Sequence, residues 1–222
     1  MVNPAFPKVS TPLLIDGPAG PIEAIVEPPE ADVPAQPVVA IACHPLSTEG
    51  GSMHNKVVTM TARALRELGI TTLRFNFRGV GQSAGAFDDG DGERDDLRAV
   101  AAWVRSQRPQ EQLWLAGFSF GAYVTLRAAG ELQPDVLISI APPAGRWDFA
   151  SIERPTMPWL VIQGDADEIV DPQAVYAWLE ATRAQAELVK MPDTSHFFHR
   201  KLMDLRGAIK NGVKAYLPAA DG

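Results

Sequence analysis

A serine flanked by two glycines stands at the centre of the segment 113–123, where residue types and spacing could support nucleophilic chemistry. Gly117, Ser119 and Gly121 follow an apolar run, and small and apolar residues follow them. This order predicts a strand, a sharp turn and a helix. Such a turn leaves no room for side chains two positions to either side of the serine. It would expose the hydroxyl at the positive end of the helix, where a developing oxyanion is favoured.

The same G-x-S-x-G pattern occurs a second time, at residues 81–85. Turn-forming residues lie on both sides of this second copy, and no helix directly follows it. Because the pattern alone is a weak signal, its surroundings decide between the two copies. We therefore interpret Ser119 as the nucleophile and Ser83 as a loop residue.

A serine hydroxyl becomes a good nucleophile when a neighbouring base takes its proton, and a histidine base needs a third group to hold its tautomer. The chain has four histidines, of which His44 and His54 precede Ser119 and His196 and His199 follow it. His196 falls in a loop between the last expected strand and the last expected helix, which favours it as the base. His199 would lie in the first turn of that helix, a position typical of a surface histidine.

The third member of the site should be an acid, and residues 161–172 contain three aspartates. Asp165 could hold the turn after a glycine, and Asp171, which precedes a proline, could cap a helix. Asp167 is the remaining candidate. Spacing alone leaves the choice among them open.

Strand-like and helical segments alternate along the chain, which indicates an α/β fold with a mostly parallel sheet and helices on both faces. The expected strands are an N-terminal hairpin over 9–16 and 22–27, then 38–43, 71–77, 113–116, 136–140, 159–162 and 186–189. Helices are expected over 53–68, around 97–104, after Ser119, around 175–179 and over 202–216. Ligands of such sheets bind beyond the carboxyl ends of the strands, so the site is expected in the loops there.

Composition limits the class of protein. The 222 residues, 46% of them hydrophobic, fit a single domain over 1–222 that can bury a full core. A net charge of -7 without a Lys/Arg-rich run argues against nucleic acid and anionic membranes as partners. Neither a membrane-spanning apolar stretch nor a secretory signal is visible. We expect a cytoplasmic protein in which the single cysteine, Cys43, is a buried thiol.

Six acidic residues between positions 88 and 96 raise the question of a metal site. The segment lacks the alternating ligands and the glycine of a calcium loop, and carboxylates ahead of a helix are stabilised by its dipole. A solvated helix start is therefore the favoured interpretation. We expect neither a metal nor a cofactor.

Three motifs, in this order along the chain, resemble the nucleophile, acid and histidine loops of α/β-hydrolase-fold serine hydrolases. They are GFSFG at 117–121, GDADEIV at 164–170 and SHF at 195–197. The resemblance covers nearly the whole chain and implies the α/β-hydrolase fold without a cap domain. The size is similar to that of dienelactone hydrolases, but their cysteine nucleophile is absent because Cys43 is not in the sharp turn that carries Ser119.

The resemblance also implies roles for single residues. In the family, the acid is the aspartate three positions after the glycine and three before the valine, which is Asp167. The turn HPL at 44–46 resembles the oxyanion loop. It implies that the backbone N–H groups of Leu46 and Phe120 are the oxyanion donors and that His44 organises the loop. The segment 75–83 matches the family's glycine-rich turn, which explains the second G-x-S-x-G copy.

These features predict an enzyme that cleaves carboxylic esters of small soluble acyl substrates through an acyl-serine. A thioesterase, a peptidase or an acyltransferase with the same triad, or a binding protein without catalysis, remain alternatives. Where the family has a lid, it usually follows the strand 136–140, and here the loop is too short for a helical cap. Arg146, Trp147 and Phe149 in this loop either rim the entrance or pack on the sheet edge.

Overall fold

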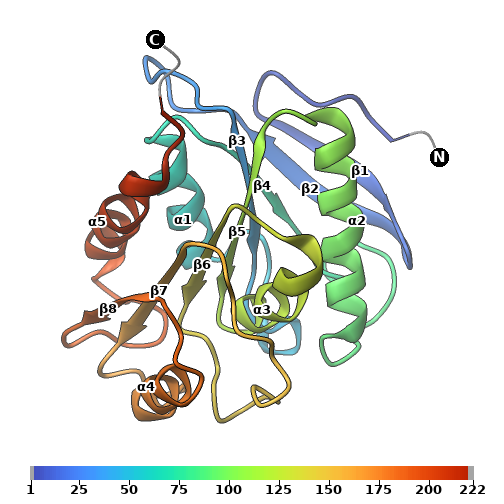
Figure 1. The fold of residues 1–222 in the computed structure, drawn as a ribbon. Helices are drawn as coiled ribbons and strands as arrows, with labels where there is room; N and C mark the ends of the chain where they lie inside the picture. The colour runs from blue at the N-terminus through green and yellow to red at the C-terminus, as the bar shows by residue number, and fades with distance from the viewer. Residues whose placement is uncertain (1–2, 220–222) are drawn as a thin grey trace.

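The computed structural model describes residues 3–219, and eight strands form a single sheet in the order β1-β2-β4-β3-β5-β6-β7-β8 (Figure 1). The strands are β1 (Thr11–Gly17), β2 (Gly20–Glu27), β3 (Val38–Cys43), β4 (Thr71–Phe75), β5 (Gln112–Phe118), β6 (Val136–Ile140), β7 (Trp159–Gly164) and β8 (Glu187–Met191). The helices are α1 (Lys56–Arg66), α2 (Asp91–Gln107), α3 (Phe120–Leu132), α4 (Pro172–Ala181) and α5 (Leu202–Val213). Short 3-10 turns cover Ser47–Glu49 and Lys214–Tyr216.

The sheet is parallel except at its N-terminal edge. β1 and β2 form the predicted antiparallel hairpin, and β2 runs antiparallel to β4. From β4 onward every neighbouring pair is parallel, so the loops after these strands meet at one edge. This confirms the predicted α/β-hydrolase fold and directs attention to that edge.

Helices cover both faces of the sheet, with α1 and α5 on one side and α2 and α3 on the other (Figure 1). The burial of β3 on both faces explains its continuous apolar sequence. Val39 and Ile41 belong to the core beneath α2, α3 and α4, whereas Val38 and Ala40 belong to the core beneath α1 and α5. A parallel strand buried on both faces cannot alternate with polar residues.

The helices predicted over 53–68 and 202–216 are shorter in the structure, and His199 lies outside the second of them. α1 begins at Lys56, three residues later than predicted, because the Asn55 side chain caps it and Met53 stays in the preceding loop. α5 begins at Leu202, so the prediction that His199 lies in its first turn was wrong. Positive φ angles of 53° at Phe198 and 58° at Arg200 interrupt the helical path on both sides of this histidine.

No helix within residues 3–219 has the length and apolar character needed to cross a bilayer. Cys43 is buried at the end of β3, as predicted, and its burial raises the pKa of the thiol.

Candidate active site

Ser119 occupies the sharp turn between β5 and α3. Its backbone has φ 53° and ψ -119°, a strained conformation for a residue with a side chain. A Cβ atom on Gly117 would lie 2.4 Å from the carbonyl oxygen of Gly121, and one on Gly121 would lie 2.3 Å from that of Cys43. The spacing of the two glycines therefore has the steric cause that the sequence predicts.

The structure brings Ser119, His196 and Asp167 together from three loops at the same edge of the sheet. The Nε2 atom of His196 lies 3.0 Å from the Oγ atom of Ser119. Its Nδ1 atom lies 2.8 Å from Oδ2 of Asp167. Because a carboxylate only accepts, Nδ1 carries the proton and Nε2 is free to accept from the serine hydroxyl.

The carboxylate of Asp167 is buried and fully engaged. Its Oδ1 atom accepts from the N–H groups of Ile169 at 2.9 Å and Val170 at 2.8 Å. Burial acts to raise the pKa of Asp167, but the hydrogen bonds from His196 and from these two N–H groups outweigh it and hold the pKa below its usual value. The acid therefore stays ionised beside the imidazole.

The other two aspartates of the segment lie elsewhere. Asp165 is exposed in the turn after β7, and Asp171 caps α4 by accepting from the N–H of Gln173 at 2.9 Å. Gln163, which the sequence did not single out, donates from Nε2 to Oδ2 of Asp167 at 3.1 Å. It is completely buried, and its position at the end of β7, next to the acid loop, was the available signal.

The predicted oxyanion loop folds tightly on itself after β3. The carbonyl of Leu46 accepts from the N–H groups of Glu49 at 3.1 Å and Gly51 at 3.0 Å, which fixes the peptide between Leu46 and Ser47. Phe120 is the first residue of α3, where N–H groups have no acceptor within the helix. Leu46 and Phe120 both line the same cleft as Ser119.

His44 is buried beneath this loop and uses both of its ring nitrogens there. Nδ1 donates to the carbonyl of Pro45 at 2.7 Å, and Nε2 accepts from the N–H of Phe77 at 3.0 Å. Burial lowers the pKa of His44 to about 4, although the bond to Pro45 acts to raise it. This geometry fits a loop organiser and leaves no nitrogen for Ser119. His54 and His199 are exposed.

The second G-x-S-x-G copy has a structural use. The hydroxyl of Ser83 donates to the carbonyl of Asn76 at 2.6 Å and accepts from the N–H of Glu23 at 2.9 Å. It thereby ties the glycine-rich turn to β2. Ser83 is the loop residue that the sequence predicts.

A cleft of about 560 Å³ opens at the serine. Its lining residues are Pro45, Leu46, Glu49, Gly50, Gly51, Asn55, Ser119, Phe120, Pro143, Arg146, Trp147, Ile169, Val170, His196 and Phe197. Arg146 and Trp147 thus border the entrance, whereas Phe149 packs in the core between Tyr123 and Trp178. Residues 141–158 contain no helix, so the segment provides no cap over the cleft.

The acidic segment before and within α2 binds arginines and backbone. Asp96 pairs with Arg78 at 2.9 Å, and Asp91 pairs with Arg127 at 2.6 Å. The carboxylate of Glu93 accepts from the N–H groups of Asp88 and Gly90 and so closes the start of the helix. Asp91, Glu93 and Asp96 thus have structural partners.

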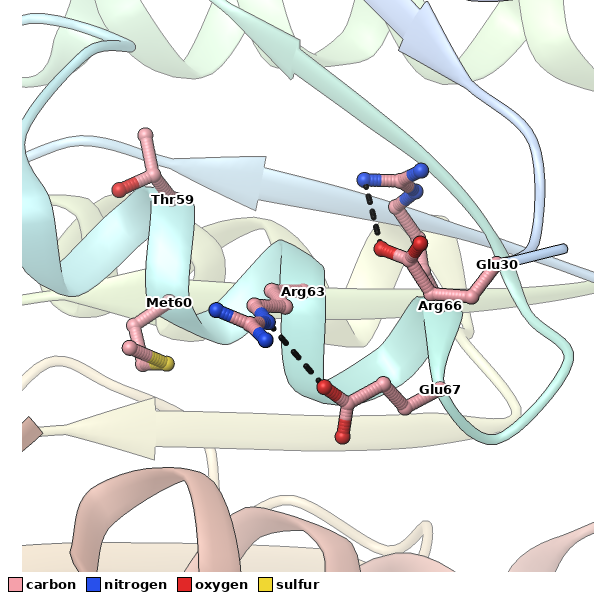
Figure 2. Close-up of a pocket in the computed structure, with 6 residues that line it drawn as sticks. All are labelled: Glu30, Thr59, Met60, Arg63, Arg66 and Glu67. Atoms are coloured by element: carbon pink, nitrogen blue, oxygen red, sulfur yellow. Dashed lines mark hydrogen bonds and ion pairs between the residues drawn. The ribbon is translucent and has the colours of Figure 1, made fainter. Parts of the chain in front are cut away.

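A second hollow lies along α1, away from the carboxyl ends of the parallel strands. Its lining side chains include two arginines (Figure 2). Arg66 pairs with Glu30 at 3.1 Å, and Arg63 pairs with Glu67 at 3.1 Å. The charges that face this hollow neutralise one another.

Comparison with known proteins identifies relatives of this chain. The family described as serine aminopeptidase, S33, matches residues 46–149. The crystal structure of an α/β serine hydrolase without a lid from Xanthomonas campestris is 72% identical in sequence, with a TM-score of 0.96, and the match covers 98% of this chain and 100% of that one. An α/β serine hydrolase homologue from Coxiella burnetii is 43% identical, with a TM-score of 0.90 and coverage of 94% and 100%.

An uncharacterized protein of Rickettsia prowazekii is 33% identical over 210 residues, which are 90% of this chain and 87% of that protein. The fold, the three converging loops and these similarities lead to one conclusion. The chain belongs to the α/β-hydrolase-fold serine hydrolases that have no lid.

Proposed function

We propose that the protein hydrolyses carboxylic esters of small acyl substrates through an acyl-serine intermediate. Ser119 is the nucleophile, His196 the base and Asp167 the acid that orients it. The observation that carries the proposal is the 3.0 Å contact between Nε2 of His196 and Oγ of Ser119. It is made by an imidazole whose other nitrogen is bound to an ionised carboxylate.

The geometry supports a two-step reaction. Oγ of Ser119 attacks the acyl carbon while its proton passes to Nε2 of His196, and the negative charge moves to the former carbonyl oxygen. The N–H groups of Leu46 and Phe120 stabilise this oxyanion. The intermediate collapses, and the alcohol leaves with the proton from His196. Water then loses a proton to the same nitrogen and attacks the acyl carbon, and the acid is released as His196 returns the proton to Oγ of Ser119.

The cleft favours small apolar acyl groups. Leu46, Phe120, Trp147 and Phe197 provide apolar surface around Ser119. Such a surface binds the hydrocarbon part of an alkyl ester, which has no polar groups that need hydrogen-bond partners.

An aminopeptidase is the second candidate, because Glu49 lines the cleft and a carboxylate there would bind the free ammonium group of a peptide substrate. The family match to serine aminopeptidases supports the same alternative. The two candidates share the triad and differ in the group that leaves.

A fluorophosphonate probe and a panel of substrates test both candidates. The probe should label wild-type protein at Ser119, Ser119→Ala should abolish labelling, and Ser83→Ala should retain it. An adduct on Ser83, or labelling that survives Ser119→Ala, would overturn the assignment. Nitrophenyl esters should give a burst of one nitrophenol per active site as the acyl-serine accumulates. Faster cleavage of aminoacyl anilides than of esters would favour the aminopeptidase.

A further inference from the structure

The loop that carries Leu46 is anchored at both ends on β4 and the residues that follow it. At its start, His44 accepts from the N–H of Phe77. Near its end, the N–H of Met53 donates to Oδ1 of Asn76 at 2.8 Å, and the carbonyl of Met53 accepts from Nη1 of Arg74. Arg74 and Asn76 lie two positions apart on one face of the extended chain. Together they bind both backbone polar groups of Met53.

These two side chains are themselves held by acidic residues of β2. Nδ2 of Asn76 donates to Glu23 at 2.9 Å, and Nε of Arg74 donates to Glu27 at 3.0 Å. Burial acts to raise the pKa of Glu23, but bonds from the N–H of Gln82 and from Asn76 outweigh it and lower the pKa. The carboxylate therefore remains an acceptor for Asn76.

The network continues outward to the hollow along α1. Glu27 also lies 3.6 Å from Arg66, whose ion pair with Glu30 is drawn in Figure 2. Arg74 is thus the inner end of a charged chain that connects β4, β2 and α1. This arrangement limits the movement of its guanidinium.

Arg74 and Asn76 are polar although both are buried. Asn76 is 2% exposed and Arg74 6% exposed, while Leu73, Phe75 and Phe77 on the opposite face pack into the core. Buried polar groups cost free energy unless every group finds a partner, and apolar side chains often stabilise such a position equally well. A role beyond stability is therefore expected where both side chains bind the backbone of a loop in the site.

We propose that Asn76 and Arg74 are positioning residues that hold the Leu46 N–H in the oxyanion hole. The inference rests on the proposed function, because it assigns Leu46 as a donor. A series of turns connects Leu46 to Met53. Leu46 bonds to Gly51, the N–H of Asn55 bonds to the carbonyl of Ser52, and Met53 lies between them. Release of Met53 would loosen the end of the loop that Asn76 and Arg74 anchor, while His44 still holds its start through the carbonyl of Pro45.

Loss of this anchor should affect stabilisation of the transition state more than substrate binding. A donor aligned in advance stabilises the oxyanion by an amount worth about 10²–10³ in turnover, and its misplacement leaves ground-state binding largely intact. Asn76→Ala and Arg74→Ala should therefore lower kcat while KM changes little. Arg74→Lys, which keeps a donor and a positive charge, should recover part of the loss.

The experiment compares an oxygen ester with its thionoester, whose sulfur is a weak hydrogen-bond acceptor and gains little from the hole. Asn76→Ala should lose about 10- to 100-fold in kcat on the oxygen ester and less than about threefold on the thionoester. The control is Ser139→Ala, which removes a buried bond to Trp159 in the sheet without contacting the loop. It should leave the ratio of the two rates unchanged.

Hydrogen exchange of residues 44–55 gives a second measurement that does not depend on activity. Exchange should accelerate by about tenfold or more in Asn76→Ala and stay as in wild type in Ser139→Ala. Unchanged exchange, or an equal loss on both esters, would overturn the inference. Wild-type protein that cleaves neither ester would reject the proposed function, and the exchange result would still decide whether Asn76 anchors the loop.

Discussion

The carboxylate of Asp167 lies 2.8 Å from Nδ1 of His196, 29 positions further along the chain. This contact decides which ring nitrogen faces the serine, because a carboxylate can bind only the protonated nitrogen. In the proposed reaction, the aspartate acts on Ser119 through the tautomer of the histidine. Its own hydrogen bonds from the backbone of Ile169 and Val170 keep it in the orientation that this requires.

Replacement of Asp167 by asparagine should reduce kcat by a factor on the order of 10⁴, the loss known for the equivalent change in a serine protease. The amide cannot stabilise the imidazolium, and it favours the wrong tautomer. Asp165→Asn is the matched control, since Asp165 is exposed in the same loop, and it should stay near wild-type activity. Steady-state rates on a nitrophenyl ester check this. A larger loss for Asp165→Asn would move the acid to that residue.

Gly121→Ala should prevent folding or lower the free energy of unfolding by more than about 4 kcal/mol, because steric overlap with backbone has no flexible side chain to relieve it. The new Cβ would lie 2.3 Å from the carbonyl oxygen of Cys43. Gly207→Ala is the control. Its Cβ would meet nothing within 4 Å in α5, so the change should stabilise the protein by about 0.5–1 kcal/mol. Urea denaturation measures both free energies of unfolding. A soluble, stable Gly121→Ala protein would contradict the steric requirement for glycine at this turn.

The free energy of unfolding should fall as pH decreases from about 6.5, the pKa of an unfolded histidine, toward 4. Burial lowers the pKa of His44 to about 4 in the folded state, so between these values the unfolded chain binds the proton more readily. A shift of this size corresponds to roughly 3 kcal/mol at most. Urea denaturation across this range should show a smaller slope for His44→Asn than for wild type. An equal slope for His44→Asn and wild type would contradict this prediction.

The value of kcat/KM on soluble nitrophenyl esters should rise over the first few acyl carbons and then stop rising. Each buried methylene contributes about 0.8 kcal/mol, or roughly fourfold, until the chain leaves the cleft. No increase should accompany the passage of substrate into micelles, because residues 141–158 form no helix that a lipid surface could displace. A rate that climbs steadily to long chains, with activation at the interface, would show that another segment acts as a lid.

Much of the fold could be predicted because its signals are local. The apolar run 38–43 and the glycines around Ser119 report burial and backbone geometry directly. The start of α1 could not be placed, because Met53 has the helical spacing of a core residue. Its position in the loop depends on contacts with Asn76 and Arg74 from a distant strand.

The site shows the same division between local and distant signals. Ser119 and His196 lie in loops whose places follow from the order of strands and helices. Spacing left the acid open among three aspartates, because the answer depends on which carboxylate reaches a histidine from another strand. Gln163 and Arg74 were missed for the same reason. The alternation of polar and apolar residues over 72–77 was the signal that could have revealed the anchor.

The uncapped loop after β6 also bears on the fate of the acyl group. In the proposed reaction, the acyl carbonyl on Ser119 faces this cleft once the alcohol has left, with no helix from residues 141–158 above it, and solvent can refill the vacated space. Water then competes for the acyl carbon at the concentration of the bulk liquid, against any alcohol or amine at millimolar levels. Another acceptor would need its own binding contacts in the cleft to prevail. In the proposed reaction, an entrance of this form therefore favours hydrolysis of the intermediate by mass action.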